Sequence, residues 1–256
     1  MKAFLAFLKK ECMESVRNGK LFILLILFLL FGMMNPAIAK LTPWMLEMMS
    51  ESLAESGMTV TEVEVDALTS WTQFFKNIPM ALIVFVLLYG GSFVSEYQAG
   101  TLVLVLTKGL ARYKVVLAKA LWMLALWTGG YWLCFYVTYA YNDFYWDNAI
   151  AENLISSVLF WYLFGLFVIA CIVLFSVVVR GYAGVLIATG ASVLGSYLLG
   201  LLPKLNPYMP TTLMESAPLL VGAKAAEDYL SAVIVTVALA IAMIIVSIPI
   251  MNRRSL

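Results

Sequence analysis

Apolar residues in this chain form six long stretches, separated by segments that carry nearly all of the charges. A helix needs about 20 apolar residues to cross the hydrocarbon core of a bilayer, and each stretch has roughly that length. The pattern therefore predicts an all-α integral membrane protein with six transmembrane helices. No composition break or internal repeat divides the chain, so we expect one transmembrane domain over residues 1–256. The approximate bounds of the predicted spans are 21–39, 76–94, 115–140, 154–179, 182–202 and 229–251.

The segments outside these stretches predict shorter helices. Residues 1–20 combine an apolar side with several basic residues, which is typical of an amphipathic helix lying on a membrane surface. We expect its basic residues, Lys10 among them, to reach lipid phosphates. The loop 41–73 shows methionines and glutamates on opposite sides at helical spacing, which predicts a short amphipathic helix. The four prolines of 203–228 favour short separate helical pieces over one straight helix.

Composition and charge support the membrane assignment and give it an orientation. The chain is 63% apolar and 12% charged, whereas a soluble domain is about one quarter charged. Segments on the side of residues 1–20 hold 12 of the 16 basic residues, and those on the other side hold 12 of the 15 acids. The positive-inside rule then predicts that both termini are cytoplasmic. A net charge of +1 gives no reason to expect a nucleic-acid partner.

The first apolar stretch has an alternative interpretation as a signal peptide. Basic residues precede it, and the small residues Ala37 and Ala39 near its end resemble a cleavage site. The amphipathic segment before it is long for a signal peptide, which favours a retained span.

The sequence lacks the residues that most catalytic and ion-driven mechanisms need. It has no histidine, and its three cysteines show no metal-binding spacing. It also lacks a phosphate-binding loop, so we expect no ATP, metal or other cofactor in this chain. No acid or base lies in the middle third of a predicted span, which argues against a proton or sodium relay. Lys119 lies near the cytoplasmic end of its span, where it can snorkel to the surface.

Two further patterns concern packing. The fifth stretch carries five small residues spaced by four, which lets another helix approach closely in lipid. This contact could lie within the chain or form a dimer seam. Aromatic residues crowd 131–146, which is typical of a belt at the membrane boundary, although they could also line a substrate path. The small residues of the fifth stretch are Gly184, Ala188, Ser192, Ser196 and Gly200.

The segment between the second and third stretches resembles the signature of type-2 ABC transporter permeases. Glu96, three further residues and then Gly100, Thr101 and Leu102 match that signature. Arg112 and Lys119 follow at the spacing where the family places an arginine and then a lysine opening the third span. Asn206-Pro207 and the terminal run 252–256 are also similar to the family. One departure is Gly109, where the family usually has proline, so we expect a looser bend there.

The resemblance implies a permease subunit, with a second permease chain, identical or related, and two separate ATPase subunits. ATP and magnesium would be bound by the ATPase. The segment after Glu96 would be a cytoplasmic coupling helix that inserts into an ATPase groove. An alternative is a turn that merely faces lipid headgroups. Glu96 would support the helix through backbone N–H groups or a nearby arginine. The coupling residues implied are Glu96, Gly100, Thr101, Leu102, Val105, Leu106 and Arg112.

The cargo is less well determined by the sequence. In layout the chain is most similar to bacterial exporters of amphipathic peptides, the phenol-soluble modulin exporters, which implies a location in the bacterial cell membrane. An apolar interior suits amphipathic or hydrophobic cargo, and we expect peptides. The alternatives are export of an antibiotic, a lipid or sodium on the same fold. A non-transporting accessory membrane protein is a further alternative.

Overall fold

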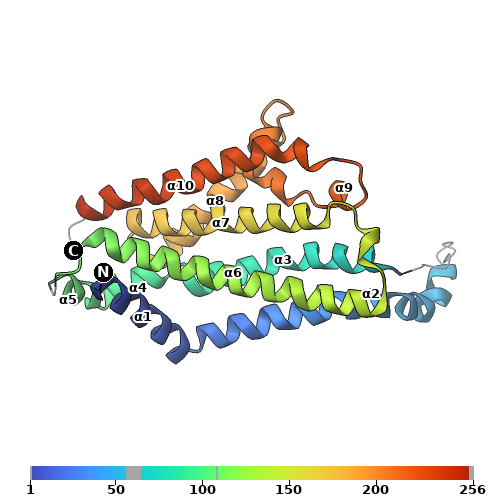
Figure 1. The fold of residues 1–256 in the computed structure, drawn as a ribbon, viewed down its shortest axis with the longest axis horizontal. Coiled ribbons are helices and arrows are strands. Elements are labelled where there is room, and N and C mark those ends of the chain that lie inside the picture. Colours follow the sequence, from blue (N-terminus) through green and yellow to red (C-terminus); the bar gives the residue numbers. More distant parts are fainter. Residues whose placement is uncertain (1, 56–64, 108, 254–256) are drawn as a thin grey trace.

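The computed structural model describes residues 2–55, 65–107 and 109–253, and helices joined by short turns make up most of them (Figure 1). Six helices in this described part are long and apolar enough to cross a membrane, which confirms the predicted all-α membrane fold. They are α2 (Lys20–Glu55), α3 (Ala67–Tyr89), α6 (Arg112–Tyr145), α7 (Leu154–Val178), α8 (Tyr182–Gly200) and α10 (Leu230–Arg253).

Short helices lie before and between the long ones. The predicted short pieces of 203–228 are present as three 3-10 turns and one α-helical turn, as expected from the spacing of the prolines. The shorter elements are α1 (Lys2–Arg17), α4 (Ser92–Gln98), α5 (Thr101–Thr107), η1 (Asn148–Ile150), η2 (Asn206–Tyr208), η3 (Pro210–Met214), α9 (Ala217–Leu220) and η4 (Ala226–Tyr229).

Helix α2 is much longer than the span predicted at 21–39. It continues through Pro36 and Pro43 to Glu55, so the short helix expected in the outer loop is a continuation of α2. A proline removes one backbone hydrogen bond and kinks a helix without having to end it. Residues 56–64 of the predicted outer loop lie outside the described residues. Helix α3 also starts early, because the carboxylate of Asp66 caps it by accepting from the Thr69 N–H at 2.9 Å.

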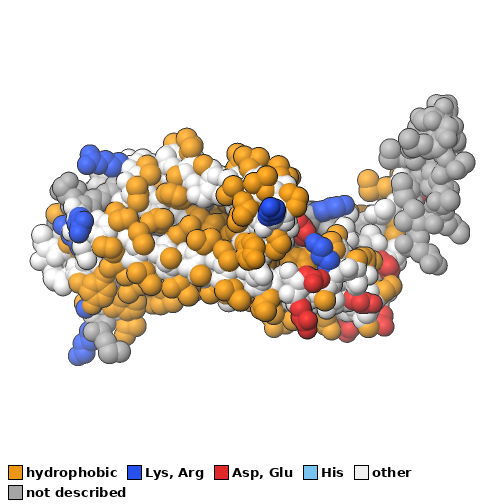
Figure 2. Space-filling view, turned by 90° about the horizontal axis from the view of Figure 1, so that it is seen from above, with side chains coloured by type: hydrophobic (Ala, Val, Ile, Leu, Met, Phe, Trp, Pro, Cys, Tyr) orange, Lys and Arg blue, Asp and Glu red, His pale blue; other side chains and the backbone are white. Residues whose placement is uncertain are grey.

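The long helices run side by side along the longest axis of the molecule (Figure 1). Helices α1, α4 and α5 and the last turn of α10 lie together at one end, which we call the terminal end. The opposite end, beside η1 and α9, is the distal end. Apolar side chains cover the middle of the surface, lysines and arginines lie toward both ends, and the visible acids lie toward the distal end (Figure 2). The surface therefore has an apolar band between two polar ends, as a membrane requires.

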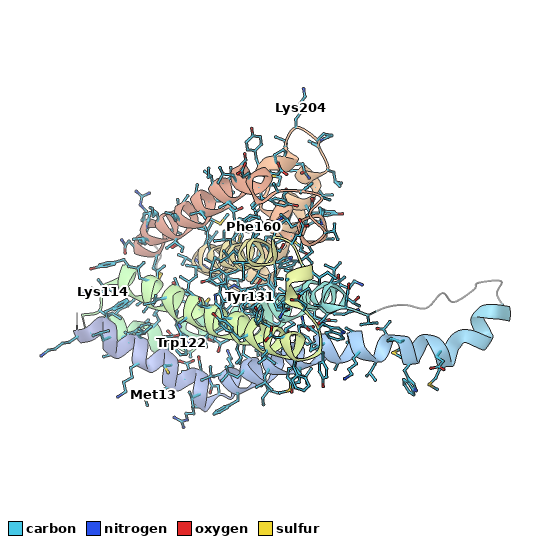
Figure 3. The ribbon with its side chains drawn as sticks, turned by 45° about the vertical axis from the view of Figure 1, so that its right-hand side comes forward. Met13, Lys114, Trp122, Tyr131, Phe160 and Lys204 are labelled. Atoms are coloured by element: carbon cyan, nitrogen blue, oxygen red, sulfur yellow. The ribbon has the colours of Figure 1, made fainter. Side chains whose placement is uncertain are left out.

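Aromatic rings fill the centre of the bundle. The Trp127 indole lies 5.3 Å from the Tyr131 ring and 5.8 Å from Phe28, centroid to centroid. The Tyr131 hydroxyl donates to the Val158 carbonyl at 2.7 Å, and Tyr131 lies among the central helices (Figure 3). The aromatic segment 131–146 is thus divided: Tyr131 is core, whereas Phe144 is 80% exposed as a boundary residue would be. Close packing of large rings joins α2, α6 and α7 into one stiff unit.

Gly165 in α7 offers a test of this packing, because a β-carbon there would overlap the indole of Trp127. We expect Gly165→Ala to lower thermal stability in detergent, since overpacking a close-packed core costs about 1–3 kcal/mol. Gly190→Ala in α8 is the matched control, because its β-carbon would meet open space. That variant should be as stable as the wild type or slightly more stable. Equal melting temperatures for Gly165→Ala and the wild type would contradict this account.

Candidate functional site at the terminal end

Two glycine turns fold the connection between α3 and α6 into a compact unit. Gly100 ends α4 with φ +68° and Gly109 follows α5 with φ +88°, backbone conformations that favour glycine. Gly100 therefore provides a tight turn between α4 and α5. Proline could not adopt the positive φ of Gly109. The Gly109 N–H donates to the Leu106 carbonyl at 3.0 Å, so a hydrogen bond closes this bend, and a looser bend than the family's stays a prediction.

A buried ammonium group lies behind this unit. Lys119 of α6 is 1% exposed, and its Nζ donates to both carboxylate oxygens of Glu11 at 2.9 and 3.0 Å. The same Nζ donates to a carboxylate oxygen of Glu96 at 3.0 Å and to the Ser92 carbonyl at 3.2 Å. An ammonium withdrawn from water needs such partners to remain charged. One lysine therefore holds α1, α4 and α6 together.

A second lysine completes the cluster at its rim. Lys10 of α1 is half-buried and donates to Glu96, and it lies 2.6 Å from a carboxylate oxygen of Glu14. Oxygens of Glu11, Glu14 and Glu96 lie within 4.8 Å of one another, a spacing that could hold a metal ion. Lys10 and Lys119 already supply positive charge to these oxygens, so the three carboxylates have two ammonium groups as partners.

Helix α1 presents its buried face to the bundle at one residue per turn. Phe7, Glu11 and Ser15 are buried at a spacing of four. The indole N–H of Trp122 in α6 donates to the Ser15 hydroxyl at 2.8 Å. In Figure 3, Trp122 lies where α6 passes α1, and Met13 lies on the outer side of α1. The exposed side of α1 is partly apolar, and it remains available for the membrane surface.

The cluster shifts the acid–base behaviour of its members on α1. Burial raises the pKa of Glu11, although the Lys119 ammonium opposes this change. Burial would lower the pKa of Lys10, but hydrogen bonds to Glu14 and Glu96 raise it overall. Because the pKa of Glu11 is higher in the folded chain, its contribution to stability is present at low pH. That contribution is lost as the pH rises through the folded pKa.

Three expectations from the sequence were wrong here. Lys119 does not snorkel to the surface, because two carboxylates and a carbonyl satisfy it inside the bundle. Glu96 is held by lysines and not by backbone N–H groups or an arginine. Lys10 turns toward these acids and away from lipid phosphates. Glu11 was missed, since an acid within a largely basic helix resembles a solvent-facing residue. The signal that could have found it is the need of Lys119 for a counter-charge.

The apolar side of α5 faces its own bundle. Leu102 is 1% exposed, and Val105 and Leu106 are partly buried against the same core. The expectation that Leu102 enters a partner's groove was therefore wrong, because the chain itself buries this side chain. The outer side of α5 is formed by Thr101, Val103 and Thr107, and Val103 is 43% exposed.

Arg112 connects the start of α6 to the end of α10. Its guanidinium donates to the Met251 carbonyl at 3.2 Å and to the Asn252 carbonyl at 3.3 Å. The last carbonyls of a helix have no intrahelical partner, so a cation placed there caps α10. Tyr97 of α4 reaches the same turn, with its hydroxyl 2.7 Å from the Met251 sulfur. The α4–α5 unit and the start of α6 are thus joined to the last span as well as to α1.

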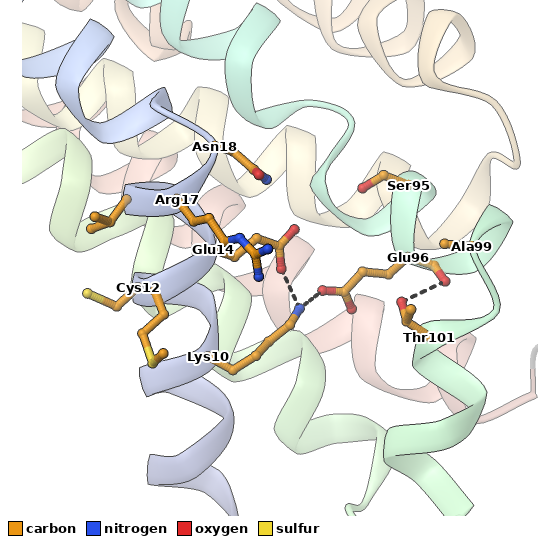
Figure 4. A pocket seen from close by; sticks show the side chains of 11 residues that line it. Lys10, Cys12, Glu14, Arg17, Asn18, Ser95, Glu96, Ala99 and Thr101 are labelled. Atoms are coloured by element: carbon orange, nitrogen blue, oxygen red, sulfur yellow. Dashed lines mark hydrogen bonds and ion pairs between the residues drawn. The ribbon is translucent and has the colours of Figure 1, made fainter.

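A cleft of about 990 Å³ opens between α1 and the α4–α5 unit. Figure 4 shows Lys10 paired with Glu14 of its own helix and reaching across the cleft to Glu96, with Thr101 and Ala99 at the opposite wall. Arg17, Asn18 and Ser95 also line the cleft. This combination of an apolar lining with charged groups is suited to a protein segment that carries both kinds of side chain.

Comparison with protein families places this geometry in context. The family model described as ABC-2 family transporter protein matches residues 5–210, which include α1, the charge cluster and the α4–α5 unit. The chain belongs to the ABC-2 transporter family. It is therefore a membrane component of a transporter, and the family implies a partner ABC ATPase. Neither the curated proteins nor the solved structures contain a match to this chain.

In this ABC-2 family chain the small residues of α8 contact its own helices. A β-carbon on Gly184 would overlap Val179, and the Ser196 hydroxyl lies 3.4 Å from that of Thr211. The Gly200 carbonyl accepts from the Asn206 side chain at 2.9 Å. Ala188 and Ser192 are partly buried on the same side. The contacts of this stripe are thus within the chain, and a role at a dimer seam stays a prediction.

An apolar groove of about 490 Å³ lies between α3, α7, α8 and η3. Leu82 and Val86 of α3 form one wall, and Gly190 and Tyr197 of α8 form the other. Thr189 also lines it; this residue is buried, and its hydroxyl has no hydrogen-bond partner in the described part of the chain. The groove therefore offers an extended apolar surface with one free hydroxyl.

The charge cluster makes a direct prediction about stability. Lys119→Met removes the ammonium but keeps the length of the side chain, leaving Glu11 and Glu96 with the half-buried Lys10 in place of two lysines. Removing one member of a buried ion pair costs about 3–5 kcal/mol, so the melting temperature in detergent should fall strongly. Adding Glu11→Gln should restore part of the loss, because a neutral amide leaves one unpaired charge fewer.

The matched control is Lys114→Met, which removes a lysine from the same helix that makes no ion pair within the described residues. Its melting temperature should stay near that of the wild type. The Lys119→Met defect should be larger at about pH 8 than at about pH 5.5, because unpaired buried carboxylates fold best when protonated. If both lysine variants lose the same stability, the buried cluster is not a structural centre.

Proposed function

We propose that this chain is the permease subunit of an ATP-driven exporter, coupled to separate ATPase subunits through its terminal end. One observation carries the proposal: Lys119 joins the α4–α5 unit to α1 and α6 through buried ionic hydrogen bonds. A displacement of α4–α5 must therefore move the transmembrane helix α6 or break this cluster. Work done by a partner on the surface can reach the spans by this route.

The distribution of charge supports a cytoplasmic position for the terminal end. The charges visible at this end are lysines and arginines, whereas acids and basic residues mix toward the distal end, and an excess of positive residues favours the cytoplasmic side of a membrane (Figure 2). Both termini are then cytoplasmic, where an ATPase has access to nucleotide. ATP and magnesium bind to that partner, and a bacterial cell membrane is the location we infer.

The docking surface for the ATPase comprises the outer side of α5 and the cleft beside α1. Val103 supplies an exposed apolar contact, and Leu102 anchors α5 from behind. The cleft adds Glu14 and Arg17, whose opposite charges can fix the orientation of a partner segment. Two ATPase copies and a second permease chain, identical or related, complete the assembly that we propose.

The groove between α3 and α8 supports an amphipathic or hydrophobic cargo, and we propose peptides. Its walls are almost entirely apolar, and apolar pockets bind ligands mainly through buried apolar area. A bare sodium ion would need several oxygen ligands, whereas the groove offers the hydroxyls of Thr189, Thr211 and Tyr197 far outnumbered by apolar side chains. An antibiotic or a lipid remains the alternative cargo class on the same surface.

Docking can be tested at Val103 without disturbing the core. Val103→Asp places a charge on the exposed side of α5, where burial under a partner would leave it unpaired. We expect normal membrane insertion but several-fold lower recovery of the ATPase in a pull-down. Val103→Thr has nearly the same shape and no charge, so it should recover the ATPase much as the wild type does. Equal recovery by Val103→Asp would place the docking surface elsewhere.

Cargo binding can be tested by filling the groove. Gly190 lines the groove and has open space around its β-carbon position, so Gly190→Phe should project a ring into it. We expect lower peptide-stimulated ATPase activity and efflux in reconstituted vesicles. Gly195→Phe is the matched control, because Gly195 also has open space in α8 but does not line the groove. Similar activity of the two variants would show that cargo does not use the groove.

A further inference from the structure

Two prolines seven residues apart remove hydrogen-bond donors from α2. Pro36 and Pro43 have no N–H, so the carbonyls four residues earlier, on Gly32 and Ala39, lose their usual partners. In a membrane a carbonyl without a partner is costly, because water is not available to replace it. The side chains of the neighbouring helix α6 are therefore the natural source of donors.

The Gly32 carbonyl has a replacement donor from α6. The Thr138 hydroxyl of α6 donates to the Gly32 carbonyl at 3.1 Å. The side-chain amide of Asn35 donates to Thr138 Oγ1 at 3.1 Å, and that of Asn77 in α3 donates to Asn35 Oδ1 at 2.7 Å. Asn35 and Thr138 are buried, so a complete hydrogen-bonded layer joins α2, α3 and α6 at Pro36.

Asn142 of α6 has no such hydrogen bonds within the described residues. Asn142 lies one turn beyond Thr138 and is 0% exposed, yet neither atom of its amide has a hydrogen-bond partner in the part of the chain that the structure describes. Ala39, whose carbonyl Pro43 deprives of a donor, is also buried. The Asn142 amide of α6 thus lacks a partner, and the Ala39 carbonyl of α2 lacks its usual helical donor.

The spacing of the two pairs explains why only one forms. Helices α2 and α6 both run from the terminal to the distal end (Figure 1). Gly32 and Ala39 are seven residues apart, a rise of about 10.5 Å, whereas Thr138 and Asn142 are four apart, a rise of about 6 Å. With Thr138 bonded to Gly32, Asn142 therefore lies about 4.5 Å short of the Ala39 carbonyl along the axis.

We propose that α2 and α6 have two alternative registers, the present one with Thr138 on the Gly32 carbonyl and a second with Asn142 on the Ala39 carbonyl. Helix α2, including Gly32 and Ala39, reaches the second register by sliding along α6 toward the terminal end, with Pro36 and Pro43 allowing it to bend. Each register leaves the other pair open, so the two have comparable costs. A packed interface with two discrete arrangements acts as a ratchet. On the proposed function, this ratchet is the distal gate of the exporter.

Substitutions at Asn142 and Thr138 should change the melting temperature in opposite directions. Asn142→Leu removes an amide that has no partner in the present register, so the melting temperature should rise by about 2–4 °C. Thr138→Val removes a donor in use, so the melting temperature should fall by a similar amount. The two residues lie one turn apart on one helix, which makes them matched controls for each other. A lower melting temperature for Asn142→Leu would show that its amide is already paired and would overturn the proposal.

A distance measurement tests the second register without an ATPase. Spin labels replace Lys40 of α2 and the exposed Phe144 of α6, in a chain whose native cysteines are changed to alanine. We expect two distance populations by EPR, reduced to one by Asn142→Leu. One population in both chains would overturn the two registers. In vesicles with the ATPase, Asn142→Leu should slow efflux. If even the unaltered chain exports nothing, the proposed function fails, while the EPR result still decides the registers.

Discussion

The interaction on which the terminal end depends is the burial of one ammonium group, that of Lys119. Inside a membrane protein the attraction between opposite charges is strong, and so is the penalty for a charge without a partner. Glu11 and Glu96 come from segments that would otherwise have only weak reasons to stay together. Helix α1 has a modest apolar face, and α4 has only seven residues. The shared lysine converts these short elements into one body with α6.

This body and the aromatic centre of the bundle have complementary mechanical properties. The rings around Trp127 and Tyr131 are close-packed, so they resist deformation and transmit displacement. The layer near Pro36 relies on a few directional hydrogen bonds, which can exchange partners as close packing cannot. The stiff aromatic core lies between the Lys119 cluster and the polar layer at Pro36, so a displacement at one end can be transmitted to the other. That arrangement suits a transporter whose energy enters at one end only.

Much of the fold could be predicted from the sequence, because long apolar stretches have few alternatives in a bilayer. The spans at 115–140, 154–179 and 182–202 agree closely with α6, α7 and α8. The end of α2 could not be predicted, because a proline can either end or kink a helix and only its tertiary partners decide. The span predicted at 76–94 begins nine residues after the start of α3, because the Asp66 cap that starts this helix leaves little hydrophobic signal.

The candidate site was predictable in position but not in its contacts. The family signature led to Glu96, Gly100 and Arg112, and the turn at Gly100 followed from glycine chemistry. The partner of Lys119 lies 108 residues earlier in the chain, and no local pattern joins such positions. Leu102 shows the same limit, since an apolar side of a short surface helix fits a partner or its own bundle equally well. In the structure, Leu102 packs into its own bundle.

The contact between Arg112 and α10 has a consequence for how the protein is made. The carbonyl that Arg112 caps at Met251 lies 139 residues later in the chain. The start of α6 and the α4–α5 unit therefore stay incomplete until the chain has been synthesised through the end of α10. A nascent or prematurely stopped chain lacks the turn that Arg112 and Tyr97 hold. On the proposed function, such a chain would present an incomplete surface to the ATPase, and unfinished subunits would not be engaged.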